Sequence, residues 1–235
     1  RQMCIRDRVK GLMAWHRQHE LPIYARDLDA LAKAVASPMS PAQVTLHLDR
    51  TQASLTRTLE NAIPRTVRLA KTLTDEQVAR FMADRVKRQQ ERQHDFATQS
   101  KAEMIKGFRE KMNERLVFWI GKVKPAQEPL ITQWAEWQYE MMAPWLDFQE
   151  AWTKELDRLM KQRQSPDFGQ ELTRLLQQGD GLMDGRFTGY TDQSRQRTIQ
   201  WLSDLSHSMD LSQRAHLYTL LKDYAEDFEG MTRSR

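Results

Sequence analysis

The chain has 235 residues, which is enough to bury one sizeable core without disulfides or metals. Its 36 basic and 32 acidic residues leave a net charge of +4, too small an imbalance to identify a nucleic-acid binder. Glycine and proline are sparse, at 9 and 8 residues, and no apolar run approaches the ~18 residues of a membrane-spanning helix. This composition favours an all-α protein.

The first eight residues, RQMCIRDR, look like translated sequencing-adapter sequence and are left out of the fold prediction. They contain the sole cysteine, Cys4, so the rest of the chain has no disulfide, thiol chemistry or cysteine-ligated metal. Three residues before Cys4 are too few for the apolar signal segment of a lipid anchor. We therefore expect residues 1–8 to be non-native and residues 9–235 to form a single helical domain that lacks its native N-terminus.

Helical spacing of apolar residues and helix-start signals predict an elongated bundle of about seven or eight helices. Pro22 is expected to kink or divide the first helix, Pro64 to interrupt the second, and Pro144 to kink the most apolar one. The long third helix can break near Ser100, which forms a capping box with Glu103. The expected helices span 9–36, 41–63, 75–122, 125–164, 166–178, 192–208 and 211–228.

Four helix starts share one pattern, in which an apolar residue is followed by a capping position, two further residues and a glutamine. The cap side chain accepts a bond from an unpaired amide of the new helix, and the glutamine bonds back to the amide of the cap. Lys124 departs from the pattern because it carries no oxygen, although Pro125 still suits a first turn. The pattern predicts helix capping rather than chemistry. The copies are Met39–Gln43, Leu73–Gln77, Val123–Gln127 and Met209–Gln213.

Two further segments differ in composition from the rest of the chain. Residues 179–189 hold four of the nine glycines, which predicts a short Gly-rich connecting loop. This segment has neither a preceding strand nor the Lys-Ser or Lys-Thr step of a phosphate-binding loop. Residues 84–95 contain a single aliphatic side chain, Val86, which predicts a solvated or protruding portion of helix.

The least ordinary set of side chains is a stripe of tryptophan, methionine and phenylalanine on the helix expected over residues 125–164. Its helical spacing suits a helix that faces its neighbours, so a buried core is one interpretation. Large aromatics and pliable methionines also form adaptable surfaces for unfolded segments, partner helices or lipid interfaces. Burial distinguishes the two interpretations. The candidate binding surface comprises Trp134, Trp137, Met141, Trp145, Phe148 and Trp152.

The alternative of a metal-dependent helical-bundle enzyme rests first on His16, His19 and Glu20, which one helix could present to a single ion. Known helical zinc motifs order their residues differently, and nothing nearby supplies a further ligand. A surface cluster is therefore the expected interpretation.

Glu91 and His94 have the Glu-x-x-His spacing of di-iron bundles, and Asp204 with His207 is a weaker copy of it. A di-iron site also needs two further inward glutamates, and Glu91 lies in the most polar stretch of the chain. No Gly-x-Ser-x-Gly elbow is present. We predict no catalytic residue, metal site or cofactor.

A nucleic-acid-binding helical protein is the remaining alternative. Arg80–Arg115 holds ten basic residues against six acidic ones. Because the acidic residues interrupt the basic ones throughout, a solvated helical face is expected and nucleic acid is not an expected partner.

Three further motifs carry a family resemblance. They are WHRQHELPIYA at Trp15–Ala25, FWIG at Phe118–Gly121 running into Val123 and Gln127, and LSQRAHL at Leu211–Leu217. With them the chain resembles, over residues 11–228, a family of uncharacterised, mostly helical lipoproteins of Gram-negative bacteria, a domain of unknown function. The resemblance implies a signal peptide and a lipidated cysteine upstream, and a periplasmic, membrane-anchored mature protein. It brings no activity or catalytic residues.

Leu73–Gln77 is also similar to the Leu-Thr-x-x-Gln motif of Spy-like and CpxP-like periplasmic chaperones. Those proteins are much shorter and carry two such motifs, whereas only this copy fits here literally. Helix capping explains the motif by itself, so the chaperone likeness is an analogy.

We therefore expect a non-enzymatic periplasmic lipoprotein that acts in protein binding or envelope maintenance through helical surfaces. Other envelope proteins and unfolded clients are the expected partners, and the membrane is contacted only through the lost N-terminal lipid anchor. No oligomeric state is predicted.

Overall fold

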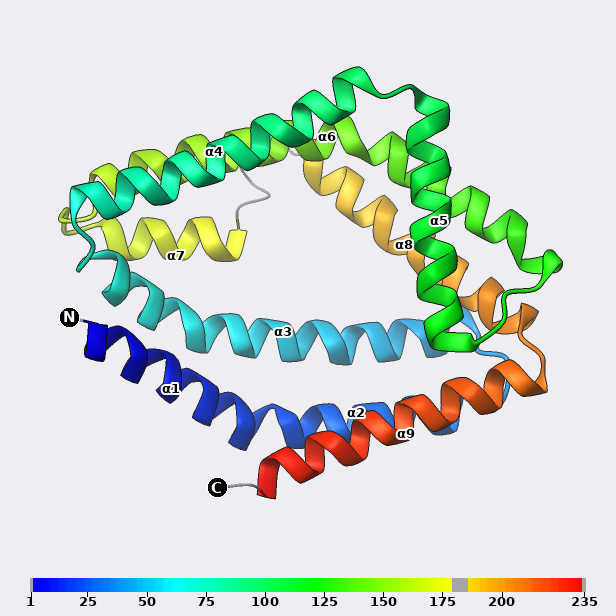
Figure 1. Ribbon diagram of the computed structural model, residues 1–235. Helices are drawn as coiled ribbons and strands as arrows, with labels where there is room; N and C mark the ends of the chain where they lie inside the picture. Colours follow the sequence, from blue (N-terminus) through cyan, green and yellow to red (C-terminus); the bar gives the residue numbers. More distant parts are fainter. Residues whose placement is uncertain (1, 179–185, 234–235) are drawn as a thin grey trace. The chain divides into compact units, whose positions relative to one another are not determined.

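The computed structural model describes residues 2–178 and 186–233, and in these ranges it contains nine α-helices, one short 3₁₀ helix and no strand (Figure 1). The prediction of an all-α fold is confirmed, with one helix more than the upper expected count. None of the described helices is both long enough and apolar enough to cross a membrane. The elements are α1 (Gln2–His19), α2 (Leu21–Ala34), α3 (Pro41–Ala70), α4 (Asp75–Thr98), α5 (Lys101–Ile120), the 3₁₀ helix η1 (Pro125–Gln127), α6 (Glu128–Lys161), α7 (Phe168–Gln178), α8 (Arg186–Ser208) and α9 (Leu211–Arg233).

Most predicted helix boundaries are confirmed where a capping residue or a proline marks them. The first helix divides at Glu20, just before Pro22, and the long third helix breaks at Ser100. At Ser40, Thr74 and Asp210 the cap side chain accepts from the amide of the box glutamine, whose own Oε1 accepts from the amide of the cap. The glutamine boxes are therefore true capping boxes in three of the four copies.

Three boundary predictions are wrong. α3 continues through Pro64 to Ala70, because Pro64 and Glu60 are both exposed and water can satisfy the Glu60 carbonyl that loses its amide partner. α7 begins at Phe168 rather than Pro166, since Ser165 ends a turn before the helix starts. α8 begins at Arg186, so the end of the predicted Gly-rich loop is helical, while residues 179–185 lie outside the described part of the chain.

The contacts divide the chain into two compact units. Unit 1 comprises residues 1–58, 106–136 and 195–235, and unit 2 comprises residues 59–105 and 137–194. Several long helices contribute to both units. The expectations of one domain over residues 9–235 and of a non-native segment over residues 1–8 stay predictions.

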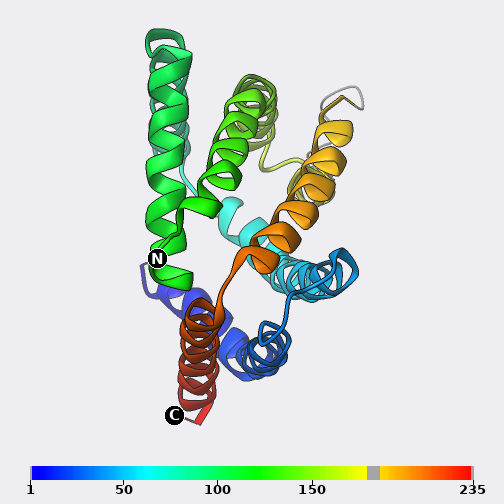
Figure 2. The same ribbon diagram turned by 90° about the vertical axis from the view of Figure 1, so that its right-hand side faces the viewer.

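Unit 1 is built around the pairing of α2 with α9, which lie side by side in both views (Figure 1 and Figure 2). One apolar cluster joins α2, α3, α8 and α9 around Ala32, Val35 and Ile199. A second cluster joins α5, α6 and α8 around Leu116, Ile131 and Leu205. These are the faces that the helical apolar spacing predicts to be buried.

The box glutamines Gln127 and Gln213 meet inside unit 1, at 0% and 2% exposure. Each Nε2 donates to the Oε1 of the other amide over 3.0 Å. Each Oε1 also accepts from the amide of its own cap, and each Nε2 has a second acceptor, Ser208 Oγ for Gln127 and the Lys122 carbonyl for Gln213. All donor and acceptor positions of both side-chain amides are filled. We call this arrangement the glutamine junction.

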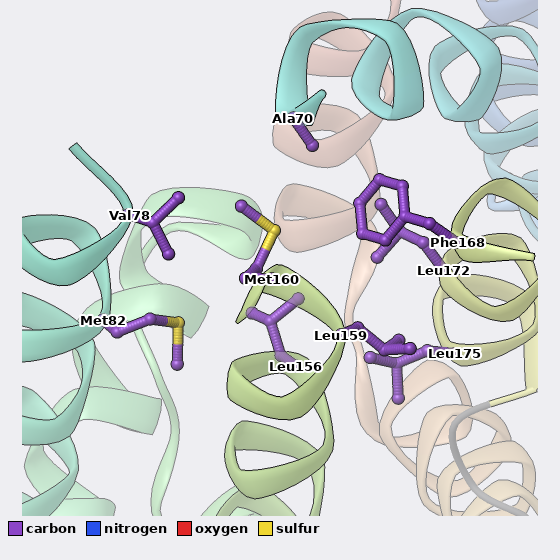
Figure 3. Close-up of a cluster of buried hydrophobic side chains, with 9 residues drawn as sticks. All are labelled: Ala70, Val78, Met82, Leu156, Leu159, Met160, Phe168, Leu172 and Leu175. Carbon is purple, nitrogen blue, oxygen red and sulfur yellow. The ribbon is translucent and has the colours of Figure 1, made fainter. Parts of the chain in front are cut away.

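The core of unit 2 forms where α3, α4, α6 and α7 meet (Figure 3). Phe168 and Leu172 of α7 lie beneath Ala70, while Val78 and Met82 point from α4 toward α6. Phe168 is fully buried. The core therefore fixes the N-terminal half of α4 against the C-terminal half of α6.

Arg163 secures the corner between α3 and α4. Its Nε donates to the Leu73 carbonyl at 3.0 Å, Nη1 donates to the Met160 carbonyl at 3.2 Å, and Nη2 donates to Asp75 at 2.6 Å. Because Arg163 is 8% exposed, these bonds replace the hydration that its charge loses.

Candidate functional site: the α4 and α6 seam

The predicted tryptophan and methionine stripe lies along α6 and is half-buried throughout. None of its six residues is fully buried and none is fully exposed. Trp134 belongs to unit 1 and packs against the cluster of Leu116, Ile131 and Leu205. The other members lie in unit 2, where Trp152 reaches the apolar core and its Nε1 donates to the Leu175 carbonyl at 3.4 Å. The stripe is therefore neither a closed core nor a free surface.

Cationic side chains of α4 cover this aromatic face in unit 2, where the two helices run alongside each other (Figure 1). The Arg85 guanidinium lies 4.3 Å from the ring centroid of Trp152, and that of Arg92 lies 5.6 Å from the ring centroid of Trp145. The two arginines are seven residues apart, and so are the two tryptophans. The later arginine contacts the earlier tryptophan, so the facing two-turn segments of α4 and α6 run antiparallel. Cations favour this position over an aromatic face because the ring quadrupole attracts them.

The register continues past the end of α4. Lys101 Nζ lies 5.4 Å from the ring centroid of Tyr139, and the ring of Phe96 lies 5.9 Å from the same ring. We call the contact between residues 82–101 and 139–153 the α4 and α6 seam.

The polar contacts of the seam are incomplete. Arg85 Nε donates to Thr153 Oγ1 at 3.1 Å, and Gln93 Nε2 donates to Glu150 at 3.3 Å. In contrast, the buried atoms Gln89 Oε1, Arg92 Nε and Gln149 Oε1 have no hydrogen-bond partner among the described protein atoms. Such groups lose free energy relative to their hydrated state.

Arg85 and Arg92 are held without a matching negative charge. No carboxylate of residues 2–178 or 186–233 forms an ion pair with either guanidinium. Burial, together with repulsion from Arg92 and Arg88, lowers the pKa of Arg85. The guanidinium groups of the seam are therefore held by aromatic rings and by the Thr153 hydroxyl instead of by ion pairs.

The prediction that residues 84–95 protrude into solvent is wrong for one face of α4. Gln89 is buried, and Arg85 and Arg92 are half-buried against α6. The prediction missed this contact because it counted aliphatic residues, whereas guanidinium planes and glutamine side chains also pack on aromatic rings. The opposite face, including Val86, is exposed as expected.

The first candidate metal cluster is used for other contacts. Glu20 is 1% exposed and accepts two hydrogen bonds from Arg57, each 3.0 Å long. His16 Nε2 lies 3.3 Å from the Tyr24 hydroxyl, and His19 Nδ1 lies 2.9 Å from the Trp15 carbonyl. Sequence patterns do not indicate Arg57 as the partner of Glu20, because the two residues lie 37 positions apart.

The second candidate set is also dispersed. Glu91 forms an ion pair with Lys87 at 4.0 Å, and His94 is exposed. Asp204 accepts from Gln200 at 2.8 Å, and His207 Nδ1 lies 2.8 Å from the Ser203 carbonyl. Within the described ranges, no three histidine, cysteine or acidic side chains gather to hold a metal ion.

The basic stretch Arg80–Arg115 is shared between the seam and ordinary surface ion pairs. Lys106 pairs with Glu110 at 4.0 Å, and Arg109 pairs with Glu128 at 3.1 Å. These pairs border a shallow hollow in unit 1 that is lined by side chains of both signs. No single basic groove follows from this arrangement.

The fold and the seam together define an all-α protein whose distinctive feature is a helical contact surface. The chain belongs to the family of unknown function DUF6279, whose model matches residues 1–187. The expected membership of a family of unknown function is thereby confirmed. Comparison with curated proteins and with solved structures gives no match.

Proposed function

We infer that this protein is a non-enzymatic binding protein that takes up apolar or amphipathic segments of other proteins on its helical surfaces. The observation that supports this function is the half-buried aromatic stripe of α6, whose Trp145 and Trp152 rings in unit 2 are faced by arginine side chains of α4. Trp145, Phe148 and Trp152 supply large contact areas at little conformational cost, and Met141 adapts to irregular partners. Aromatic and methionine side chains are also enriched at the centres of protein interfaces.

The test is protection of an aggregating client. Light scattering of reduced α-lactalbumin is followed with the wild-type chain and with Trp137→Ala and Trp145→Ala variants whose helicity is intact by circular dichroism. Wild type is expected to suppress scattering in proportion to its concentration, and both variants to suppress it less, because each loses an aromatic contact.

Trp119→Ala serves as the matched control, since Trp119 is 38% exposed but lies on α5 in unit 1. It is expected to protect as well as wild type. Absence of protection by wild type would remove the proposed function, and loss of protection only in the control would remove its location on α6.

The proposed location is the periplasm, with the mature protein anchored by a lipidated cysteine. The support is the resemblance carried by Trp15–Ala25, Phe118–Gly121 and Leu211–Leu217. Likeness to Spy-like and CpxP-like chaperones at Leu73–Gln77 is consistent with client binding but is explained by the Thr74 cap. The complete upstream reading frame tests the location, because a cytoplasmic start without a signal peptide and lipidation cysteine contradicts it.

A further inference from the structure

The inward face of α4 changes character along its length. Met82 is buried in the core of unit 2, whereas the following inward positions are two arginines, two glutamines and one phenylalanine. They are Arg85, Gln89, Arg92, Gln93 and Phe96. All other side chains of residues 83–98 are exposed. The C-terminal part of α4 is thus attached to unit 2 through this seam.

The two helices of the seam differ in net charge, although no described carboxylate of α6 forms an ion pair with Arg85 or Arg92. Residues 80–98 of α4 carry five basic and three acidic side chains, whereas residues 137–153 of α6 carry three acidic side chains and no lysine or arginine. The cation contacts on α6 come from the aromatic faces of Trp145 and Trp152, which receive the guanidinium groups of Arg92 and Arg85. A basic amphipathic helix therefore fits this side of α6.

We propose that the seam is a docking site on α6 for a basic amphipathic helix of a partner protein, and that residues 84–98 of α4 occupy this site until the partner displaces them. This inference rests on the proposed function and deepens it by naming the class of partner. The partner segment carries two arginines seven residues apart, as Arg85 and Arg92 are in α4.

Three features make α4 a displaceable occupant. Three buried atoms have no hydrogen-bond partner among the described residues: Gln89 Oε1 and Arg92 Nε of α4, and Gln149 Oε1 of α6. The two α4 atoms gain hydrogen bonds to water when α4 leaves α6. Arg85 sits over Trp152 without a carboxylate partner in the described residues. The outward face of α4 is exposed between residues 83 and 98. When the segment from residue 84 to Ser100 separates from α6, the core contacts of Val78 and Met82 stay in place.

A partner helix gains on the same surface what α4 lacks. Apolar side chains at the positions of Gln89 and Gln93 would pack against α6 without leaving a buried polar atom unpaired. Two arginines at the positions of Arg85 and Arg92 would retain the cation contacts. Helix-in-groove recognition of this kind depends on anchors at one helical face.

The probe for this site is a fluorescent synthetic peptide with the sequence of residues 80–98, added to the full-length chain. Because α4 is tethered at an effective concentration of ~1 mM, wild type should bind the peptide weakly. Replacing Arg85 and Arg92 by alanine in the protein weakens the internal competitor. The apparent affinity for the peptide, read by fluorescence anisotropy, is expected to rise about tenfold.

Two matched controls test whether peptide binding depends on the inward-facing arginines of the seam. A protein with Lys87→Ala and Arg88→Ala loses the same charge from the exposed face of α4 and should bind the peptide like wild type. A peptide with alanine at the positions of Arg85 and Arg92 should bind neither protein. Equal binding of both peptides would overturn the proposal, as would no anisotropy change with the Arg85 and Arg92 variant.

Hydrogen exchange on wild type supplies a measurement that needs no variant. Saturating peptide should accelerate exchange of the backbone amides of residues 84–98 and leave those of residues 75–83 protected. Unchanged exchange along α4 under saturation would overturn the proposal. Client protection without peptide binding removes the docking site alone, whereas peptide binding without client protection removes the proposed chaperone-like activity alone.

Discussion

Two regions of the molecule bury polar side chains between helices, and they differ in how completely those side chains are paired. At the glutamine junction of unit 1, the amides of Gln127 and Gln213 fill all their hydrogen-bonding positions. At the α4 and α6 seam of unit 2, Gln89, Arg92 and Gln149 each leave one buried atom unpaired. The same residue type is thus held firmly in one place and loosely in the other.

The difference shows that buried polarity alone does not indicate function. A fully paired network fixes the register of the helices that it joins, because any shift leaves amides unsatisfied. A partly paired contact costs free energy and persists only through its other interactions. For this reason the seam, rather than the junction, is the region from which a binding function is proposed.

The largest expected effect comes from Gln127→Leu, which breaks the junction. Gln213 and Ser208 each lose a buried partner, and the Lys124 amide loses its cap, so we expect a loss of about 3 kcal/mol in the free energy of unfolding. Urea denaturation followed by circular dichroism measures it. Gln43→Leu is the matched control, because that box glutamine is exposed and should cost less than about 1 kcal/mol. Equal losses would show that the junction adds nothing to capping.

A smaller loss is expected from Arg163→Ala in unit 2. The Leu73 and Met160 carbonyls lose a charged donor at a nearly buried site, which should cost about 2 kcal/mol. Arg163→Lys should recover only part of this, because one ammonium cannot reproduce the spread of the guanidinium donors. Arg174→Ala removes an exposed arginine of α7 and should change stability by less than about 0.5 kcal/mol.

A glutamine-to-leucine substitution, which lowers the free energy of unfolding at the junction, is expected to raise it at the seam. Gln89→Leu removes a buried acceptor that has no partner and places an apolar side chain against the aromatic face of α6. We expect a gain of about 1 kcal/mol in the free energy of unfolding. Gln90→Leu, one residue further along the exposed face, should leave stability nearly unchanged. Destabilisation by Gln89→Leu would mean that Gln89 is paired in solution.

Local features of the fold could be predicted from the sequence because their causes are local. The caps at Ser40, Thr74, Ser100 and Asp210 each depend on residues three positions apart, and all four form as expected. Pro64 shows the limit of a local rule, since the surrounding exposure decides whether a proline ends a helix.

Contacts between distant segments could not be predicted from the sequence, because no local pattern indicates which segments meet. Gln127 and Gln213 lie 86 positions apart, and nothing in either box indicates that its amide pairs with the other. The stripe from Trp134 to Trp152 was visible, but its half-buried state depends on which side chains face it. The seven-residue spacing that Arg85 and Arg92 share with Trp145 and Trp152 was a signal for the seam, although two turns of any helix give that spacing.

The smallest expected effect concerns the partly exposed ion pairs between α2 and α9 in unit 1. Asp29 accepts hydrogen bonds from Lys222 and Lys33, and these lower its pKa from 3.8 to about 2. A carboxylate whose pKa is lowered by folding stabilises the folded state above its unfolded pKa, and this contribution fades as pH falls from about 4 to about 2. Asp29→Asn should therefore lower the Tm slightly at pH 7 and leave it unchanged near pH 2. Because solvent screens these charges, 1 M NaCl should narrow the difference at pH 7. A difference in Tm that persists at pH 2 would assign the effect of Asp29 to packing instead of charge.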